Sequence, residues 1–130
     1  MMVDTSAIVA ILRLEPEAEK LTEVLDSSPQ CFMVAPNYLE LCMVLLGSKD
    51  QAAFRTVKSA LSELRIQVIA FTPEMAEVAA HAFQIYGKGR GHKAQLNFGD
   101  CIAYAASKVE AMPLLFKGAD FYKTDVECAI

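Results

Sequence analysis

Residues 1–12 read Met-Met-Val-Asp-Thr-Ser-Ala-Ile-Val-Ala-Ile-Leu. Three apolar residues precede Asp4, and Thr5 and Ser6 are residue types that cap the first turn of a helix. The apolar run that follows continues to position 12, which is typical of a buried helix. This pattern predicts a strand, a tight turn and a helix over 7–12, the start of an alternating α/β fold.

The remainder of the chain continues this alternation. Further strands are expected at 31–34, 66–69 and 114–116, and helices at 16–26, 38–46, 50–64, 73–86 and 99–110. This order predicts a parallel sheet with helices on both faces, in one domain over 1–130 without an internal repeat. Functional sites in such folds lie at the carboxyl ends of the strands, and Asp4 and Asp120 each fall just beyond a strand end.

The composition excludes several classes of protein. With 54% hydrophobic and 22% charged residues in a chain of 130, disorder is not expected. A net charge of −4 argues against broad electrostatic attachment to nucleic acid or to an anionic membrane, although a local basic patch is compatible with it. The four cysteines form no Cys-x-x-Cys pair, so neither a zinc knuckle nor a redox dithiol is indicated. No secretory signal or membrane-spanning stretch is visible, so a soluble cytoplasmic protein is expected.

Three acidic residues stand alone in apolar surroundings. Asp4, Glu40 and Asp100 are each the only charged residue of their stretch, and the stretches are 1–12, 27–48 and 94–107. A buried carboxylate is costly unless protonation, an ion pair or a metal neutralises it. Each has a structural alternative: Asp4 as a helix cap, Glu40 as an exposed helical residue, and Asp100 as a favourable charge at a helix N-terminus.

Considered together, these acids predict a metal site. Carboxylates on different elements can converge at one end of a parallel sheet, and Asp120 and Asp125 add a fourth and a fifth. Several anions share a dry site only if a cation holds them, and oxygen ligands without histidine select Mg²⁺ or Mn²⁺. Mg²⁺ commonly keeps several waters and binds substrate phosphates, which points to phosphoryl transfer or phosphodiester hydrolysis.

Four segments resemble one known family. They are Met-Met-Val-Asp-Thr-Ser-Ala at 1–7, Tyr-Leu-Glu-Leu at 38–41, Leu-Asn-Phe-Gly-Asp-Cys at 96–101 and Leu-Leu-Phe-Lys-Gly-Ala-Asp-Phe at 114–121. In this order they resemble the PIN-domain family, and more closely its VapC-type toxin ribonucleases, over essentially the whole chain. The resemblance implies a three-layer α/β/α sandwich with a central parallel sheet, a homodimer, Mg²⁺-dependent endonucleolytic cleavage of RNA, and a small antitoxin protein as partner.

The resemblance also implies roles for individual residues. The family's acidic quartet is matched, in chain order, by Asp4, Glu40, Asp100 and Asp120. Asp4 and Asp100 occupy the positions that hold the metal most directly. Thr5 or Ser6 matches the hydroxyl that usually supports this site.

The mechanism expected from these parts is hydrolysis without a covalent intermediate. Asp4 and Asp100 bind one Mg²⁺, while Glu40 and Asp120 complete its water shell or help to bind a second ion. A metal-activated water attacks the phosphodiester in line, and Glu40 or Asp120 orients that water or takes its proton. Asp125 is the alternative to Asp120, and we prefer Asp120.

A glycine-rich basic segment, Gly-Lys-Gly-Arg-Gly-His-Lys at 87–93, comes shortly before Asp100. Lys88, Arg90 and Lys93 are the predicted contacts to the RNA backbone, and the alternative is a solvated flexible loop without a specific role. The segment is not a nucleotide fingerprint, because it follows a helix and lacks the Gly-x-Gly-x-x-Gly spacing.

Apolar surface on the predicted helices suggests protein partners. The helices after Pro16 and Pro36 carry more of it than a 130-residue monomer easily hides. This excess suits both a homodimer and a groove for an antitoxin helix.

Other functions remain as alternatives. A haloacid-dehalogenase-like phosphatase has a second aspartate two residues after the first, where this chain has Ser6. A receiver domain of a signalling relay needs an acidic pair that is missing from the first strand. A non-catalytic PIN fold that binds RNA or a protein is the third alternative, and its signature would be loss of the acids, all four of which are present.

Overall fold

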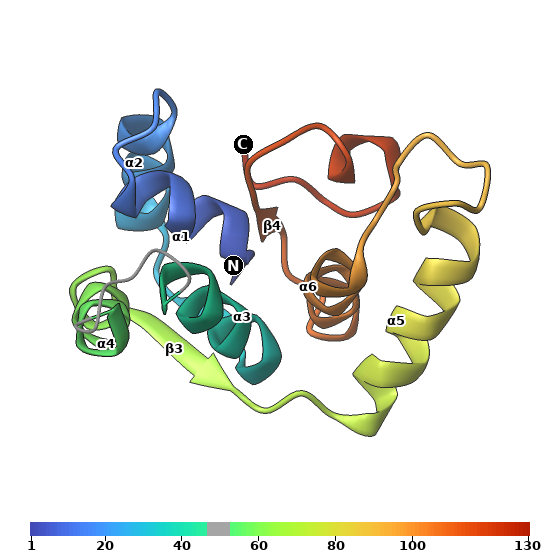
Figure 1. Ribbon diagram of the computed structural model, residues 1–130, viewed down its shortest axis with the longest axis horizontal. Helices are drawn as coiled ribbons and strands as arrows, with labels where there is room; N and C mark the ends of the chain where they lie inside the picture. Colours follow the sequence, from blue (N-terminus) through green and yellow to red (C-terminus); the bar gives the residue numbers. More distant parts are fainter. Residues whose placement is uncertain (47–52) are drawn as a thin grey trace.

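A parallel sheet of four short strands forms the centre of the protein (Figure 1). The structure is a computed structural model that describes residues 1–46 and 53–130, with side chains for 1–46 and 55–130. The strands are β1 (Met2–Val3), β2 (Cys31–Val34), β3 (Ile66–Ile69) and β4 (Leu114–Leu115). They lie in the order β3-β2-β1-β4, and every pairing is parallel, as the alternating sequence predicted.

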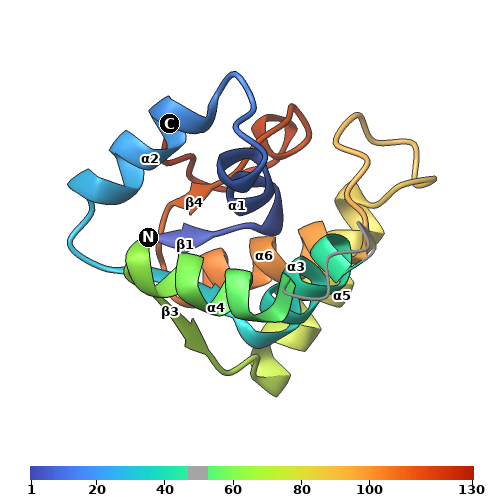
Figure 2. The same cartoon turned by 60° about the vertical axis from the view of Figure 1, so that its left-hand side comes forward.

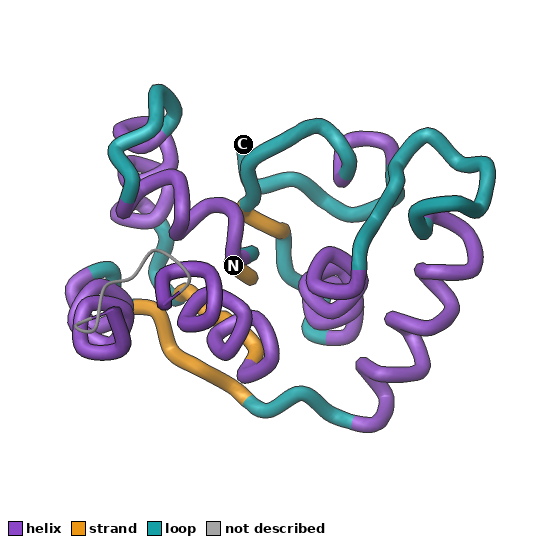
Figure 3. The backbone as a smooth tube through the Cα atoms, in the orientation of Figure 1, coloured by secondary structure: helices purple, strands orange, loops and turns teal. Residues whose placement is uncertain are grey.

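Helices cover both faces of this sheet (Figure 3). Those described are α1 (Thr5–Leu12), α2 (Ala18–Ser27), α3 (Ala35–Leu46), α4 (Ala53–Glu63), α5 (Pro73–Tyr86) and α6 (Phe98–Val109), with a short 3₁₀ helix η1 (Phe121–Lys123). In Figure 1, α1, α2 and α4 lie on the left of the molecule, and α5 and α6 lie on the right.

Alternation along the strands produces two separate cores. Successive strand residues point to opposite faces, so Met2 packs with α5 and α6, whereas Val3 packs with α1, α2, α3 and α4. Leu114 and Leu115, which pair with Met2 and Val3, divide between the cores in the same way. The predicted three-layer α/β/α sandwich is therefore confirmed.

The two edges of the sheet differ. Beyond β4, the backbone of the C-terminal segment adds hydrogen bonds, because Leu114 donates to Glu127 and Ala129 donates to Leu114. Figure 2 shows β1 and β4 side by side, with the C-terminus close to them. At the other edge, Val68 of β3 is 41% exposed.

The first helix differs from its prediction in one respect. Its N-cap is Asp4, whose extended backbone (φ −82°, ψ 156°) lets its carboxylate accept a hydrogen bond from the Ser6 N–H at 2.9 Å. The prediction that Thr5 and Ser6 act as caps was wrong. Thr5 is already the first helical residue, so both hydroxyls are free for other partners.

Other element boundaries shift by a few residues. The second helix begins at Ala18 because Pro16 and Glu17 form a preceding turn, and α3 begins at Ala35, ahead of the predicted start at 38. The helix predicted at 99–110 spans 98–109, and the strand predicted at 114–116 ends at Leu115. The helix predicted at 38–46 ends at Leu46 as expected, and the predicted helix start at 50 lies outside the described residues.

All four cysteines are free thiols, in agreement with the absence of a paired motif. Within the described ranges, no helix has the length and apolar character needed to cross a membrane.

The buried sheet residues should dominate stability. Leu115 is fully buried, whereas Leu14 is 85% exposed. We expect Leu115→Ala to lower the free energy of unfolding by about 2–5 kcal/mol, because it leaves a cavity between sheet and helices. Leu14→Ala, the matched control, should change it by less than about 0.5 kcal/mol. Urea unfolding measures both, and equal losses would contradict the layered core.

Candidate functional site

Burial and the charges of neighbouring carboxylates raise the pKa of two acidic residues, Asp4 and Asp100. The pKa of Asp4 is raised to about 6, mainly by burial. Two hydrogen bonds from Ser6 oppose this shift, and the charges of Asp100 and Glu40 add to it. Burial also raises the pKa of Asp100, with additional contributions from Glu40 and Asp120. The acidic residues predicted from the sequence therefore share one electrostatic environment.

Asp4 joins the ends of two strands. It follows β1 directly and is only 3% exposed. Its Oδ2 accepts hydrogen bonds from the Ser6 N–H at 2.9 Å and from the Ser6 hydroxyl at 2.5 Å. The Ser6 hydroxyl in turn accepts from the Lys117 N–H at 3.0 Å, just beyond β4. Asp4 is thus both a helix cap and a buried carboxylate, so its two interpretations are compatible.

Glu40 is held by donors from two helices. Its Oε2 accepts a hydrogen bond from the Thr5 hydroxyl at 2.6 Å and from the Asn37 side-chain amide at 3.2 Å. Both predicted supporting hydroxyls therefore have a partner in the site: Ser6 holds Asp4, and Thr5 holds Glu40.

Gly99 allows α6 to approach Glu40. An added Cβ at position 99 would lie 2.4 Å from Glu40 Oε1 and 2.7 Å from Oε2. Only glycine permits this approach without a shift. Asn37 and Gly99 were not predicted as site residues; the spacing of Asn37 and Glu40, three positions apart on one helix face, is the signal that could have found the first.

Asp100 completes a capping box at the start of α6. Its Oδ2 accepts from the Asn97 N–H at 2.7 Å, while Asn97 Oδ1 accepts from the Asp100 N–H at 2.9 Å. The alternative prediction, that Asp100 stabilises the N-terminus of a helix, is therefore also correct. The box fixes the Asp100 carboxylate at the helix terminus closest to Glu40.

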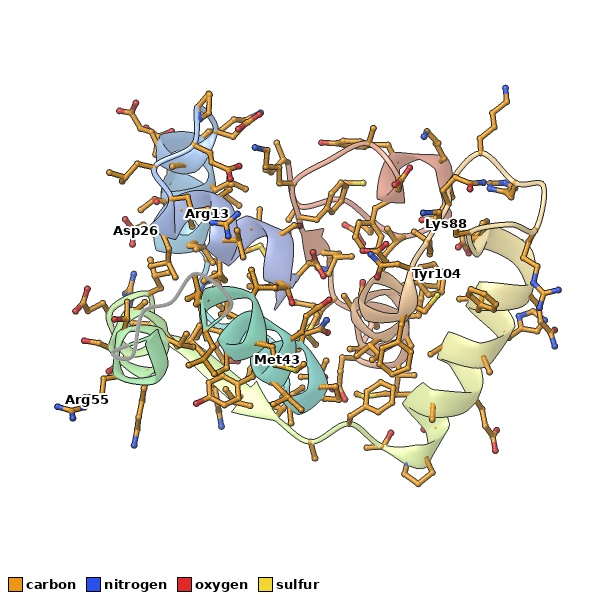
Figure 4. All side chains as sticks on the ribbon, viewed as in Figure 1. Arg13, Asp26, Met43, Arg55, Lys88 and Tyr104 are labelled. Atoms are coloured by element: carbon orange, nitrogen blue, oxygen red, sulfur yellow. The ribbon has the colours of Figure 1, made fainter. Side chains whose placement is uncertain are left out.

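Asp120 and Asp125 have different partners in the structure. Asp120 pairs with Lys123 at 3.0 Å, and its charge contributes to the raised pKa of Asp100. Asp125 instead accepts a 2.5 Å hydrogen bond from Tyr104, labelled on α6 in Figure 4. That bond is the main reason that the pKa of Asp125 is lowered, and Lys108 at 3.0 Å adds to the effect. Asp125 thus attaches the C-terminal segment to α6.

The donor set suits a hard cation. Among the residues that the structure describes, no lysine, arginine or histidine forms a salt bridge with Asp4, Glu40 or Asp100. No group of three or more acidic, cysteine or histidine side chains in these ranges is close enough to make a complete metal site unaided. Mg²⁺ fits this arrangement, because it commonly takes one or two carboxylates and keeps several waters.

Backbone hydrogen bonds hold the start of the basic segment against Leu96. Lys88 N–H donates to the Leu96 carbonyl, and Leu96 N–H donates to the Tyr86 carbonyl, both at 2.9 Å. Gly89 adopts a φ of +82°, which side chains rarely allow. The Arg90 guanidinium lies 5.3 Å from the centre of the Phe83 ring. These contacts hold the start of the segment in place, and the role of its three cationic side chains stays a prediction.

An apolar groove runs beside the carboxylates. It has a volume of about 490 Å³ and lies between α3 and α6, where Figure 4 labels Met43. Its apolar lining includes Leu39, Met43, Val44, Phe98 and Ile102, and Glu40 borders it. Phe98 is 82% exposed and also borders a second groove of about 360 Å³ against α5.

Comparison with known proteins identifies the family. The PIN domain family model matches residues 1–127. The chain belongs to the PIN domain family. Ribonuclease VapC42 of Mycobacterium tuberculosis (strain ATCC 25618 / H37Rv) is 46% identical over 129 residues, which cover 99% of this chain and 98% of that protein. The predicted resemblance is confirmed, and the phosphatase and receiver alternatives are removed.

Solved structures support the same PIN fold. VapC20 of Mycobacterium tuberculosis, a sarcin-ricin loop cleaving toxin, matches with a TM-score of 0.75 at 15% identity, covering 96% of this chain and 95% of that one. A toxin–antitoxin complex from Klebsiella pneumoniae matches with a TM-score of 0.67 at 21% identity, covering 92% and 88%. The roles of individual carboxylates in this PIN domain stay predictions.

The raised pKa of Asp4 generates a prediction about stability without metal. The pKa is about 6 in the folded protein against an ordinary 3.8, so the folded state binds the extra proton between these values. Stability therefore falls as pH rises through this window. At pH 7 in EDTA, Asp4→Asn should raise the free energy of unfolding by up to about 3 kcal/mol, since asparagine still caps the helix.

Denaturation at several pH values between 4 and 8 checks this expectation. The difference in free energy of unfolding between Asp4→Asn and wild type should be small at pH 4 and grow toward pH 7. A variant that is less stable than wild type at pH 7 would show that the Asp4 charge is favourable in the metal-free fold.

Proposed function

We propose that the protein is a Mg²⁺-dependent endoribonuclease that acts as the toxin of a toxin–antitoxin pair. The observation that carries the proposal is a buried Asp4 carboxylate, next to Glu40 and Asp100, that has no cationic partner among the described residues. The relative with 46% identity is named a ribonuclease, which supports the same activity here.

Asp4 and Asp100 are the proposed metal ligands, with Mn²⁺ as a substitute for Mg²⁺. When bound, the ion supplies an activated water and offsets the charge that develops on the phosphate. Glu40 or Asp120 orients the attacking water or accepts its proton. Thr5 and Ser6 keep Glu40 and Asp4 in place through the hydrogen bonds described above.

An antitoxin and a second copy of the chain are the proposed protein partners. The matching Klebsiella pneumoniae structure is a toxin–antitoxin complex, which supports an antitoxin. Phe98, Met43 and Leu39 are more than half exposed and border one groove. A continuous apolar patch of this kind favours coverage by a protein, and homodimerisation stays a prediction.

RNA cleavage tests the proposed function. Purified protein, freed of any antitoxin, is incubated with mixed cellular RNA in Mg²⁺, in Mn²⁺ or in EDTA, and the fragment ends are sequenced. We expect cleavage with either metal and none in EDTA. Asp4→Asn and Asp100→Asn should lower the rate by at least about 100-fold, because each removes a ligand charge and retains the side-chain shape.

Asp125→Asn is the matched control, because its carboxylate is engaged by Tyr104 and Lys108 away from the proposed ligands. It should keep most of the activity. Folded wild-type protein that binds RNA and cuts none with any metal would instead support a non-catalytic PIN module.

The basic segment is proposed to contact the RNA backbone. Lys88, Arg90 and Lys93 are all exposed, and none of them forms a salt bridge in the described part of the chain. Replacing all three by glutamine should weaken RNA binding and reduce the slope of log affinity against log salt by up to about 2, because fewer counterions are released.

This measurement uses the Asp4→Asn background, so that RNA is bound and not cut. Glutamine replacing Lys58 and Arg55, both exposed on α4, is the control for lost positive charge. An equal change of slope per removed charge in both variants would assign the effect to net charge and not to the loop.

A further inference from the structure

Asn37 is an unusual buried polar residue. The described part of the chain buries four polar or charged side chains, and they are Asp4, Thr5, Asn37 and Ser107. Asn37 lies in the first turn of α3 and is only 1% exposed. Neither the family resemblance nor the predicted mechanism gives it a role.

The Asn37 side chain connects two helices. Its amide nitrogen lies 3.2 Å from Glu40 Oε2 on α3 and 3.2 Å from the Gly99 carbonyl on α6. An amide group carries two N–H protons, so it can donate to both acceptors at once. The carboxylate of Glu40 is therefore tied to the backbone residue that immediately precedes Asp100.

The two oxygens of Glu40 have different roles in this arrangement. Oε2 accepts from both Thr5 and Asn37, whereas Oε1 accepts no hydrogen bond from any described residue. The missing Cβ of Gly99 leaves the space that the carboxylate occupies. Oε1 is thus the oxygen available for a water or a cation beside α6.

Asn37 makes these contacts at a cost. Its Oδ1 is buried and has no hydrogen-bond partner within the described structure. Rotating the amide by half a turn would place Oδ1 against the Glu40 carboxylate and the Gly99 carbonyl, two further acceptors. The two acceptors therefore determine the orientation of the Asn37 amide. The unsatisfied Oδ1 lowers the stability of the fold, so stability alone does not explain why asparagine stands here.

We propose that Asn37 is a positioning residue that fixes the Glu40 carboxylate relative to Asp100 across the contact between α3 and α6. The inference rests on the proposed function, since Glu40 acts on water or metal there. It assigns to Asn37 an effect on metal affinity and turnover that is transmitted through Glu40.

Asn37→Leu tests this role, because leucine has a similar volume and no donor. We expect Mn²⁺ affinity, measured by titration calorimetry, and kcat to fall by about 10- to 100-fold. The KM for RNA should stay unchanged, because Asn37 is not exposed to the substrate. Ser107→Ala is the matched control: it removes a buried donor that bonds to the Met112 carbonyl, and should leave metal affinity and kcat unchanged.

A double-mutant cycle distinguishes positioning from a general structural role. In a Glu40→Ala background, Asn37→Leu should have no further effect on Mn²⁺ affinity. An additional loss in that background, or wild-type affinity in the single variant, would overturn the inference. Wild-type protein that neither binds Mn²⁺ nor cuts RNA would refute the proposed function itself.

A measurement on the wild-type chain covers the case in which Asn37→Leu does not fold. The two side-chain amide protons of Asn37, followed by NMR, should exchange slowly with solvent and shift when Mg²⁺ saturates the protein. Fast exchange, or signals that do not move while those of Asp4 and Asp100 do, would overturn the inference.

Discussion

Burial of acidic side chains at the carboxyl edge of the sheet is the constraint that shapes this protein. Burial raises the pKa of both Asp4 and Asp100, and the charge of Glu40 adds to both shifts. Each is held by neutral donors, from Ser6, Thr5, Asn37 and Asn97. Neutral donors fix the positions of the carboxylates and leave their negative charge uncompensated, as the proposed cation site requires.

The sandwich supports this arrangement through the order of its elements. Asp4 ends the strand β1, while Asp100 and Glu40 lie on helices that contact each other. Because β1 lies between β2 and β4, the site is built where the two apolar cores meet at the strand ends. Serine at position 6 strengthens this junction, since its hydroxyl bridges Asp4 and the backbone at Lys117.

Much of the fold could be predicted from the sequence, because strand and helix periodicities are local. The N-cap of α1 was misassigned because Asp4, Thr5 and Ser6 are all good capping residues, and only the backbone conformation decides among them. The isolated acids were visible as charges in apolar stretches. The bridge from Asn37 to Gly99 was not, because it depends on how closely α3 and α6 pack.

At Gly99, one added methyl group would disturb the candidate site and leave the packing of the helices intact. The atoms that an added Cβ would meet belong to the end of the Glu40 side chain and not to the backbone. A substitution there can be accommodated by moving the carboxylate away from Thr5 and Asn37, with the helices still packed. A single base change that turns this glycine into alanine would therefore disturb the carboxylate and leave the packing of the chain intact.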